Sequence, residues 1–411
     1  MTVESTPARP GNHLLTQGLL NAAHAIDHMF LLIFATAVTS IAAEFGVVRW
    51  EDLMPYSVAA FFLFGIGSLP SGKLGDQWGR RKMMVVFFFG MGASALLASV
   101  AQSPLQLAGA LALMGCFASI YHPVGIPMLV QGAERPGWTI GVNGLVGNLG
   151  VAAAAVTTGF LVKFFDWRMA FALPGVLSLA CGVAFALFAT HEHAAPAKKK
   201  TIGSGVPPGV SVSKLLLVMT VAATSASLLF NFSTNSGYEL LTDRLQAILH
   251  DPARLGLLLA IVYTLASLAQ LVVGHLIDRM SLKTLWMWIA ATQIALLASS
   301  ILVDGWLFYA LQCLFMAAIF GAIPFTDAVI VRFVDDSMRS RVSGMRLAVS
   351  SGASSLAVWL IGPVVKQAGF SALLAVMTVT AFVTLCVVSQ LPRTPAPTRA
   401  EPAPMPGAKV A

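Results

Sequence analysis

Long apolar runs recur from Leu14 to Leu391, and they limit the possible folds of this chain more than any other feature. Several of them reach about 18 residues or more, the length at which a helix can cross the hydrocarbon core of a bilayer. Hydrophobic residues make up 57% of the chain and charged residues 10%, and the mean hydropathy is +0.80. These values exclude a water-soluble globular domain and predict an all-α integral membrane protein with many spans.

The apolar runs and the polar breaks between them predict twelve membrane helices in two groups of six. The first group is expected at 14–43, 53–72, 83–101, 104–130, 138–163 and 168–190, and the second at 213–240, 254–277, 284–302, 305–331, 341–365 and 369–391. The resulting regions are a cytoplasmic N-terminus at 1–13, a six-helix bundle at 14–190, a cytoplasmic linker at 191–212, a second six-helix bundle at 213–391 and a disordered cytoplasmic tail at 392–411. The linker and the tail are rich in Pro and Ala, which favours flexible chain over a packed element.

The basic residues indicate the topology. The net charge is +7, but Lys and Arg lie in short loops rather than on one continuous face, which argues against nucleic acid as a partner. Most of them fall on the side that carries both termini, so the positive-inside rule predicts cytoplasmic termini in a plasma membrane, the inner membrane of a bacterium. The first apolar run has no small-residue cleavage site, so we expect no removable signal peptide. The four cysteines lie singly in apolar runs, which indicates neither disulfides nor a zinc site.

The two groups of helices contain related motifs. Gly72-Lys-Leu-Gly-Asp76 recurs in the second half as Gly274-His-Leu-Ile-Asp278, and Pro123 corresponds to Pro324. Internal duplication of this kind predicts two pseudo-symmetric bundles around a central cavity.

A glycine-rich and basic segment, Gly72 to Lys82, separates the second and third predicted helices and is expected to form a tight cytoplasmic hinge. Together with its second copy it supplies the candidate gating residues, which are Gly72, Asp76, Gly79, Arg80, Arg81, Asp278 and Arg279. A loop that only sets the topology would account for the charge, but not for the Gly-Asp-Gly spacing.

Ionisable residues inside a membrane helix are costly and therefore candidates for function. His24, Asp27 and His28 share one face of the first helix with Asn21. A histidine beside a carboxylate can exchange a proton near neutral pH, so these three are candidates for proton coupling. A purely structural hydrogen-bonded cluster is one alternative. A metal site is another, but no further acid-rich span completes it, and we expect no metal.

Proline breaks at equivalent places in the fourth and tenth predicted helices point to a central substrate site. The candidate cavity residues are Tyr121, His122, Asn143, Asn148, Asn231, Asn235, Phe325, Asp327 and Arg346. Packing kinks without a substrate role remain an alternative. Arg346 could neutralise an anionic substrate, or it could reach the cytoplasmic surface from the start of its helix.

Two sets of motifs resemble a known family. The pattern G-x-x-x-D-x-x-G-R-R from Gly72 resembles the loop between helices 2 and 3 of the major facilitator superfamily, although Gln77 stands where that family usually has a basic residue. Segments 23–28, 121–123 and 147–150 resemble motifs of its fosmidomycin-resistance-type efflux carriers. Three positions depart from that subgroup: Asp27 takes the place of an Asn, His28 that of an acid, and Val124 that of a glutamate. The resemblance implies a transporter that works by alternating access. If the subgroup uses those acids for proton coupling, this chain has either moved the role, with Asp27 as the candidate, or lost it.

We therefore expect a secondary active transporter, and most specifically a proton-coupled exporter of a small organic molecule. No phosphate-binding Gly-x-x-x-x-Gly-Lys-Ser/Thr motif is present, so ATP is not the expected energy source. The chain is expected to be no enzyme, to need no cofactor, and to act as a monomer whose partners are substrate, protons and lipid. The alternatives are uptake or facilitated transport of an anionic metabolite or a metal chelate and, more remotely, a membrane enzyme or receptor.

Overall fold

The computed structural model describes residues 13–131, 136–189, 212–277, 279–333 and 336–392. The expected N-terminal segment, linker and tail lie outside these ranges except for residues at their edges. The division into two bundles with these boundaries stays a prediction.

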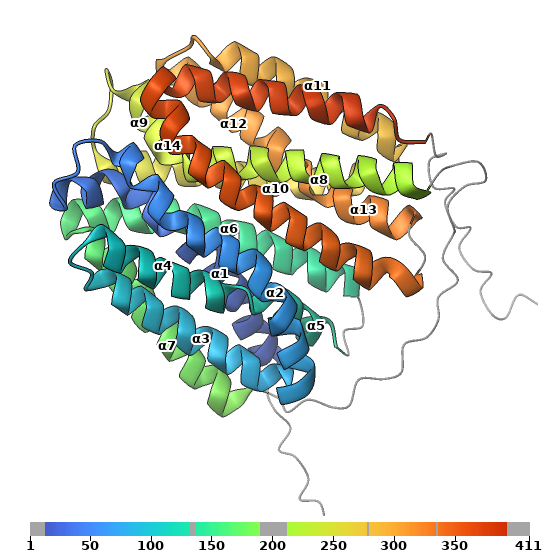
Figure 1. Cartoon of the computed structure of the whole chain (residues 1–411), viewed down its shortest axis with the longest axis horizontal. Coiled ribbons are helices and arrows are strands. Elements are labelled where there is room, and N and C mark those ends of the chain that lie inside the picture. Colours follow the sequence, from blue (N-terminus) through green and yellow to red (C-terminus); the bar gives the residue numbers. More distant parts are fainter. Residues whose placement is uncertain (1–12, 132–135, 190–211, 278, 334–335, 393–411) are drawn as a thin grey trace, which may run out of the picture.

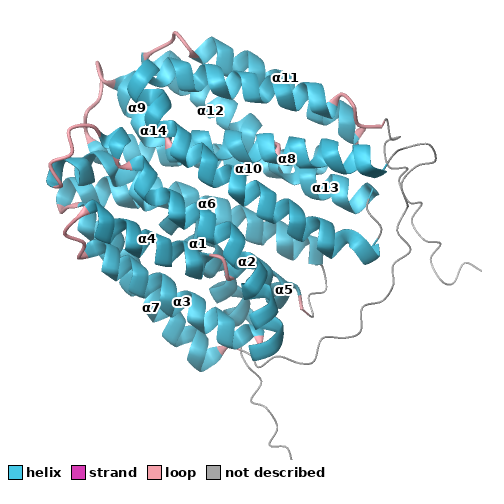
Figure 2. Cartoon of the chain, viewed as in Figure 1, coloured by secondary structure: helices cyan, strands magenta, loops and turns pink. Residues whose placement is uncertain are grey.

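Helices account for every regular element in the described ranges, and short loops connect them (Figures 1 and 2). The long helices of the first half are α1 (His13–Glu44), α2 (Val58–Trp78), α3 (Arg80–Ser99), α4 (Pro104–Ala118), α6 (Pro136–Phe164) and α7 (Trp167–Phe188). Its short helices are η1 (Trp50–Asp52), η2 (Met54–Ser57), η3 (Tyr121–Gly125) and α5 (Ile126–Val130). The second half contains α8 (Val212–Asn235), α9 (Gly237–Leu245), α10 (Pro252–Ile277), α11 (Leu282–Ser300), α12 (Gly305–Gly321), α13 (Ile323–Phe333) and α14 (Asp336–Val388).

Eleven of the described helices or helix runs are long and apolar enough to cross a membrane. The last run joins two predicted spans, because α14 continues across Gly369, whose backbone is not helical (φ 72°, ψ 179°). Only glycine adopts such a positive φ without strain, so the chain changes direction there. The prediction of an all-helical membrane fold is confirmed.

The predicted hinge at residues 72–82 is wrong in its extent. Helix α2 continues through Gly72 and Gly75 to Trp78, and the chain turns at Gly79 (φ 94°). A Cβ on Gly75 would lie 2.9 Å from Cγ2 of Val124, so this glycine permits helix packing rather than a loop.

Helices predicted as continuous are interrupted where proline removes a backbone N–H. The predicted span 104–130 divides into α4, a single π-helical turn (η3) that contains Pro123, and α5. The span 305–331 divides at Ala322, next to Pro324. The two breaks expected from the repeat are therefore present.

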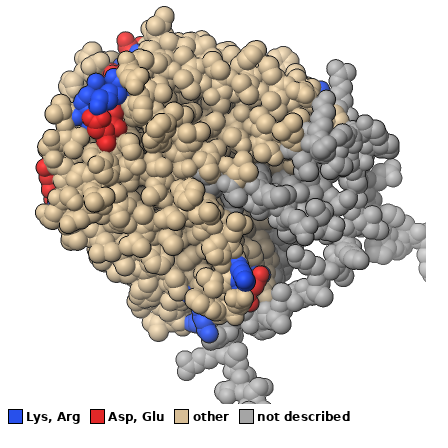
Figure 3. Space-filling view, viewed as in Figure 1, with Lys and Arg blue, Asp and Glu red and all other residues tan. Residues whose placement is uncertain are grey.

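The two halves pack along α6 and α10 and along α2 and α14. A Cβ on Gly159 of α6 would lie 2.5 Å from the carbonyl oxygen of Pro252 in α10, so glycine allows this close approach. On the face seen in Figure 3, charged side chains gather toward the two ends of the helices, and the band between them is uncharged. This distribution fits a lipid-facing belt.

Candidate functional site

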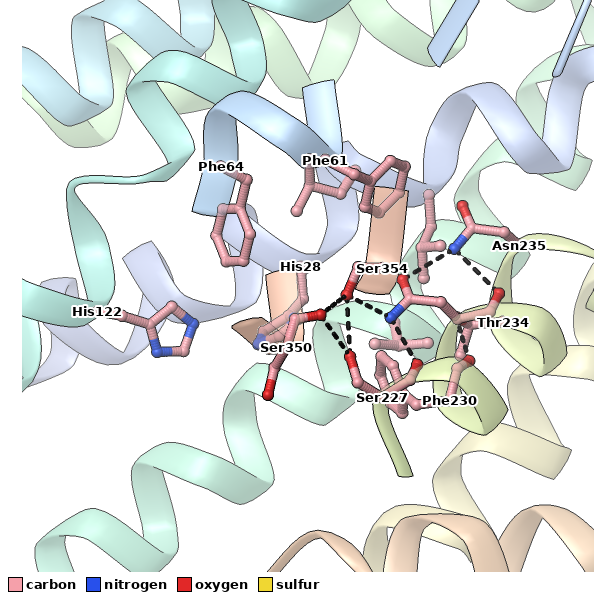
Figure 4. A pocket seen from close by; sticks show the side chains of 14 residues that line it. His28, Phe61, Phe64, His122, Ser227, Phe230, Thr234, Asn235, Ser350 and Ser354 are labelled. Carbon is pink, nitrogen blue, oxygen red and sulfur yellow. Dashed lines mark hydrogen bonds between the residues drawn. The ribbon is translucent and has the colours of Figure 1, made fainter. Parts of the chain in front are cut away.

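A cavity of about 220 Å³ lies between the two halves (Figure 4). The first half contributes mostly apolar and imidazole side chains: His28, Leu31, Leu32, Phe61, Phe64, His122 and Val151. The second half contributes mostly neutral polar ones: Ser227, Phe230, Asn231, Thr234, Asn235, Ser350 and Ser354. The predicted candidates His122, Asn231 and Asn235 thus line one cavity together with His28.

The polar wall is a connected set of hydrogen bonds between α8 and α14. Asn231 Nδ2 donates to the Ser227 carbonyl at 2.9 Å and to Ser354 Oγ at 2.8 Å. One turn further, Asn235 Nδ2 donates to the Asn231 carbonyl at 3.2 Å. The four-residue spacing of the two asparagines puts both amides on one helix face, so the sequence was informative here.

On α1, His24 and His28 form a chain of hydrogen bonds that ends at the cavity. His24 Nδ1 donates to the carbonyl oxygen of Asn143 at 2.8 Å. His24 Nε2 can therefore accept from His28 Nε2, which is 3.1 Å away. His24 is buried, whereas His28 lines the cavity. The chain of hydrogen bonds thus connects the buried interior of the first half to the cavity.

Asp27 is fully buried, and neither of its carboxylate oxygens has a hydrogen-bond partner among the described residues. The His122 imidazole, which becomes a cation when protonated, lies beside Asp27, with its Nε2 3.5 Å from Asp27 Oδ2. A buried carboxylate needs either a bound proton or a positive neighbour. Because His122 also lines the cavity, the charge state of this pair bears directly on the cavity surface.

The ligand atoms of His24, His28 and His122 lie within 4.8 Å of one another, close enough in principle to share one metal ion. Sequence spacing revealed only the pair on α1, since His122 comes from a different helix. In the structure, His24 uses both ring nitrogens in hydrogen bonds to Asn143 and His28. The arrangement is that of a hydrogen-bonded imidazole chain.

Three predicted cavity residues support the site from behind or lie outside it. Tyr121 is buried, stacks on His24 with ring centroids 4.7 Å apart, and accepts a hydrogen bond from Asn143 Nδ2 at 2.7 Å. Asn148 Nδ2 donates to Gln270 Oε1 at 3.0 Å and so joins α6 to α10. Tyr121, Asn143 and Asn148 are not among the described residues that line this cavity, since each amide or ring is taken up by a neighbouring helix.

Phe325 also lies away from this cavity. It is buried in a separate apolar cluster, where its ring stacks on Trp286 with centroids 5.1 Å apart. The proline break does redirect the chain, but the ring gains more burial between α11 and α13 than in a half-polar cavity. The side chains of Asp327 and Arg346 lie outside the described part.

The candidate gating residues are only partly placed. Arg81 donates to the carbonyls of Ala186 and Ala189 and so ties α3 to the end of α7 within one half. Asp76 is exposed and makes no hydrogen bond or ion pair with another described residue, and Arg279 is likewise exposed. Asp278 is outside the described ranges. Their role in a gate stays a prediction.

Sequence reasoning missed the contacts that join the halves at the end opposite the chain termini, here called the far end. Lys163 pairs with Asp251, and Lys366 pairs with Asp52, each across the two halves. The Lys163 ammonium, helped by the backbone N–H of Arg254, holds the pKa of Asp251 below its ordinary value. No sequence signal identifies such partners, since they lie far apart in the chain.

A third contact at the far end joins α1 to α9. Thr39 Oγ1 donates to Glu239 Oε1 at 2.8 Å, and Glu239 is buried. Together the three contacts join the two halves at the far end.

The fold and the site together define a class of protein. It is a helical membrane protein with many spans, whose two halves enclose a central cavity with buried titratable groups beside it. The family model described as Major Facilitator Superfamily matches residues 20–242 and 226–410, and the chain belongs to this family of transporters. The major facilitator superfamily is a family of transporters and not of enzymes, in agreement with the prediction from the sequence.

Several proteins similar in sequence are drug-resistance and efflux proteins. The puromycin resistance protein pur8 of Streptomyces alboniger is 34% identical over 32% of this chain and 27% of its own length. A probable actinorhodin transporter of Streptomyces coelicolor is 28% identical over 44% of this chain and 32% of its own length. The multidrug resistance protein MdtG of Proteus mirabilis is 23% identical over 73% of this chain and 76% of its own length. The chain thus spans about a third or less of the length of the first two of these curated relatives.

Among solved structures, a bacterial homolog of the human lysosomal transporter Spinster, in an inward-facing and occupied conformation, is similar in fold. The TM-score is 0.70 at 12% identity, covering 94% of this chain and 96% of that one. This likeness confirms the fold.

Proposed function

We propose that this chain is a secondary active transporter that exports small organic molecules by alternating access. The cavity between the halves supports this proposal, and the relatives named as efflux or resistance proteins agree with it. The basic residues support an orientation with both termini in the cytoplasm. The bacterial relatives support a location in a bacterial inner membrane. In that orientation the far end faces outward, and its three contacts fit a state closed to the outside. We further propose that it acts as a monomer.

The energy source in this proposal is the proton gradient, and Asp27 is its centre. The observation that carries it is the fully buried Asp27 carboxyl beside His122, whose imidazole lines the cavity. A proton bound at this pair changes the charge next to the substrate space. Proton and substrate can then oppose each other's binding through one coupling free energy, which is what an antiporter requires.

The test is transport in proteoliposomes, with puromycin as the first probe because one relative is named for resistance to it. In the wild type, an inward-directed proton gradient should drive puromycin against its own gradient. Asp27→Asn keeps the size of the side chain but cannot exchange the proton. It should abolish gradient-driven flux while leaving puromycin exchange at equal pH.

Asp304→Asn is the matched control, because Asp304 is an exposed carboxylate that pairs with Arg244 inside one half. It should leave both fluxes near wild type. Full gradient-driven flux in Asp27→Asn would refute the proton assignment. Equal loss of both fluxes would show a structural role for Asp27 instead.

A further inference from the structure

We infer that the cavity selects an aromatic molecule that bears hydroxyl groups and no negative charge. This inference rests on the proposed function, since it names the substrate class of the same cavity. It comes from an asymmetry between the two walls, one of which is apolar and aromatic while the other offers hydrogen-bond acceptors (Figure 4).

Apart from the Ser350 hydroxyl, which donates to no described residue, the donors of the polar wall are used inside the protein. Both N–H bonds of the Asn231 amide go to Ser227 and Ser354. Asn235 Nδ2 donates to two oxygens of Asn231, the carbonyl oxygen at 3.2 Å and Oδ1 at 3.4 Å.

The other hydroxyls of this wall follow the same pattern. Thr234 Oγ1 donates to the Phe230 carbonyl at 2.7 Å, and Ser227 Oγ donates to the Ser350 carbonyl at 2.9 Å. A hydroxyl that donates its hydrogen keeps lone pairs for accepting. The wall therefore presents oxygen acceptors, with Asn235 Oδ1 and Thr234 Oγ1 as the available ones.

A ligand facing such a wall must donate hydrogen bonds. Alcohol groups do so, whereas a carboxylate has only acceptor atoms and would find a single free donor among the described residues on this side, the Ser350 hydroxyl. No Lys, Arg, Asp or Glu is among the described residues that line the cavity. A negative ligand charge thus has no cationic side chain to balance it there, apart from the two imidazoles on the opposite wall.

The opposite wall fits a flat ring. Phe61 and Phe64 of α2 and Leu31 and Leu32 of α1 provide apolar surface. Phe64 meets His122 edge to face at 5.8 Å between ring centroids, which leaves aromatic faces available to a ligand. The volume of about 220 Å³ is below the roughly 300–1,000 Å³ of pockets for drug-sized ligands. One aromatic ring joined to one small polyol is the expected size.

The test uses three probes that separate these features: phenyl glucoside, phenyl glucuronide and glucose. The glucuronide differs from the glucoside in one carboxylate, and glucose lacks the ring. Binding to the purified full chain in detergent is measured by calorimetry. We expect the glucoside to bind at least about tenfold more tightly than either other probe, a difference of about 1.4 kcal/mol. Equal or tighter binding of the glucuronide, or no binding of the glucoside, would overturn the inference.

A pair of variants tests the acceptor wall itself. Thr234→Val removes a cavity acceptor and keeps the side-chain shape. Thr292→Val is its match, because Thr292 makes the same bond to the carbonyl four residues earlier, on the exposed face of α11. We expect glucoside affinity to fall about 5-fold or more in Thr234→Val and to be unchanged in Thr292→Val.

Asn235→Leu is a second cavity variant, and it should weaken glucoside binding about 5- to 150-fold. If both cavity variants bind the glucoside within about twofold of wild type, the polar wall does not recognise the ligand. These binding results are independent of transport. Glucoside binding without any proton-driven flux would count against the proposed function alone, and puromycin flux without glucoside binding would count against this inference alone.

Discussion

Single glycines control how closely the side chains of the site can pack. Gly147 of α6 lies directly against His24, and a Cβ there would be 2.5 Å from the imidazole Cε1. Real Cβ atoms do not approach other atoms so closely, so the ring would have to move away from the Asn143 carbonyl that it binds.

Gly147→Ala should therefore lower stability by about 1–3 kcal/mol and also reduce proton-driven flux, because the imidazole chain is displaced. Gly144→Ala is the control on the same helix, since no atom lies within 4 Å of its Cβ position. Thermal unfolding of the two purified variants compares them. A Gly147→Ala protein as stable as Gly144→Ala would contradict the packing described for His24.

At the residue level, the sequence predicted which side chains are polar and buried but not which neighbours they meet. Asn231 and Asn235 line the cavity together, and helical spacing alone puts them on one face. Tyr121 and Asn143 lie outside this lining, because a buried polar group satisfied by another helix looks the same in sequence as one that faces a cavity. The proximity of His122 to Asp27 depends on the packing of η3 against α1, which no local pattern encodes.

At the scale of elements, two glycines with positive φ set where helices end or bend. Gly79 separates α2 from α3, and Gly369 interrupts α14. No atom lies within 4 Å of the Cβ position of Gly369. A side chain there would clash with no neighbour, and its only cost would be the strain of a positive φ in the backbone.

Gly369→Ala should cost about 1–2 kcal/mol of stability, since an L-residue is forced into the left-handed region. Gly352→Ala, in the same helix and with open space around it, should be neutral or slightly stabilising because alanine favours helix. Chemical or thermal unfolding in one detergent measures both. An unchanged midpoint for Gly369→Ala would show that the break in α14 is not maintained by this residue.

Helix existence was predictable because apolar length is a direct consequence of the bilayer thickness. The residues at which the helices end were less predictable. The stretch from Gly72 to Trp78 looks like a loop in sequence, but the packing of Gly75 on Val124 makes it helical. Tertiary contact outweighs the low helix propensity of glycine at this point.

At the scale of the whole molecule, ion pairs between the halves favour the state that is closed at the far end. Lys163–Asp251 and Lys366–Asp52 both cross between the halves, and both are partly exposed. Exposed pairs are worth about 0–1 kcal/mol each, so together they bias the conformation without locking it.

The double variant Asp52→Asn, Asp251→Asn should raise the population open at the far end, by up to about fivefold for each pair lost. Spin labels on cysteines introduced at Val48 and Ile248, after replacement of the native cysteines, report the separation of the halves at this end. Asp304→Asn, which breaks an ion pair inside one half, should leave the distance distribution unchanged. A double variant with the wild-type distribution would show that these pairs do not hold the far end.

The same labels test the pH dependence. The pKa of Asp251 in the folded protein is below its ordinary value, so the Lys163 contact is fully present above the ordinary value. It is lost as the pH falls through the lowered value, below the usual range near about 3.9. We expect the Lys163–Asp251 contact to contribute no change in the distance distribution from neutral pH down to about pH 5 and to broaden it only in stronger acid. Broadening already near pH 6 would assign the change to another group.

The two walls of the cavity come from different halves of the chain, and this has a consequence for how such a protein can diversify. Every titratable side chain on the described lining belongs to the first half, and the hydroxyl and amide wall belongs to the second. Substitutions in α8 and α14 can therefore alter which ligands the cavity accepts while the titratable residues on α1 and η3 stay as they are. After gene duplication, one copy can therefore gain a new ligand range through substitutions in the second half, while the titratable residues of the first half remain unchanged.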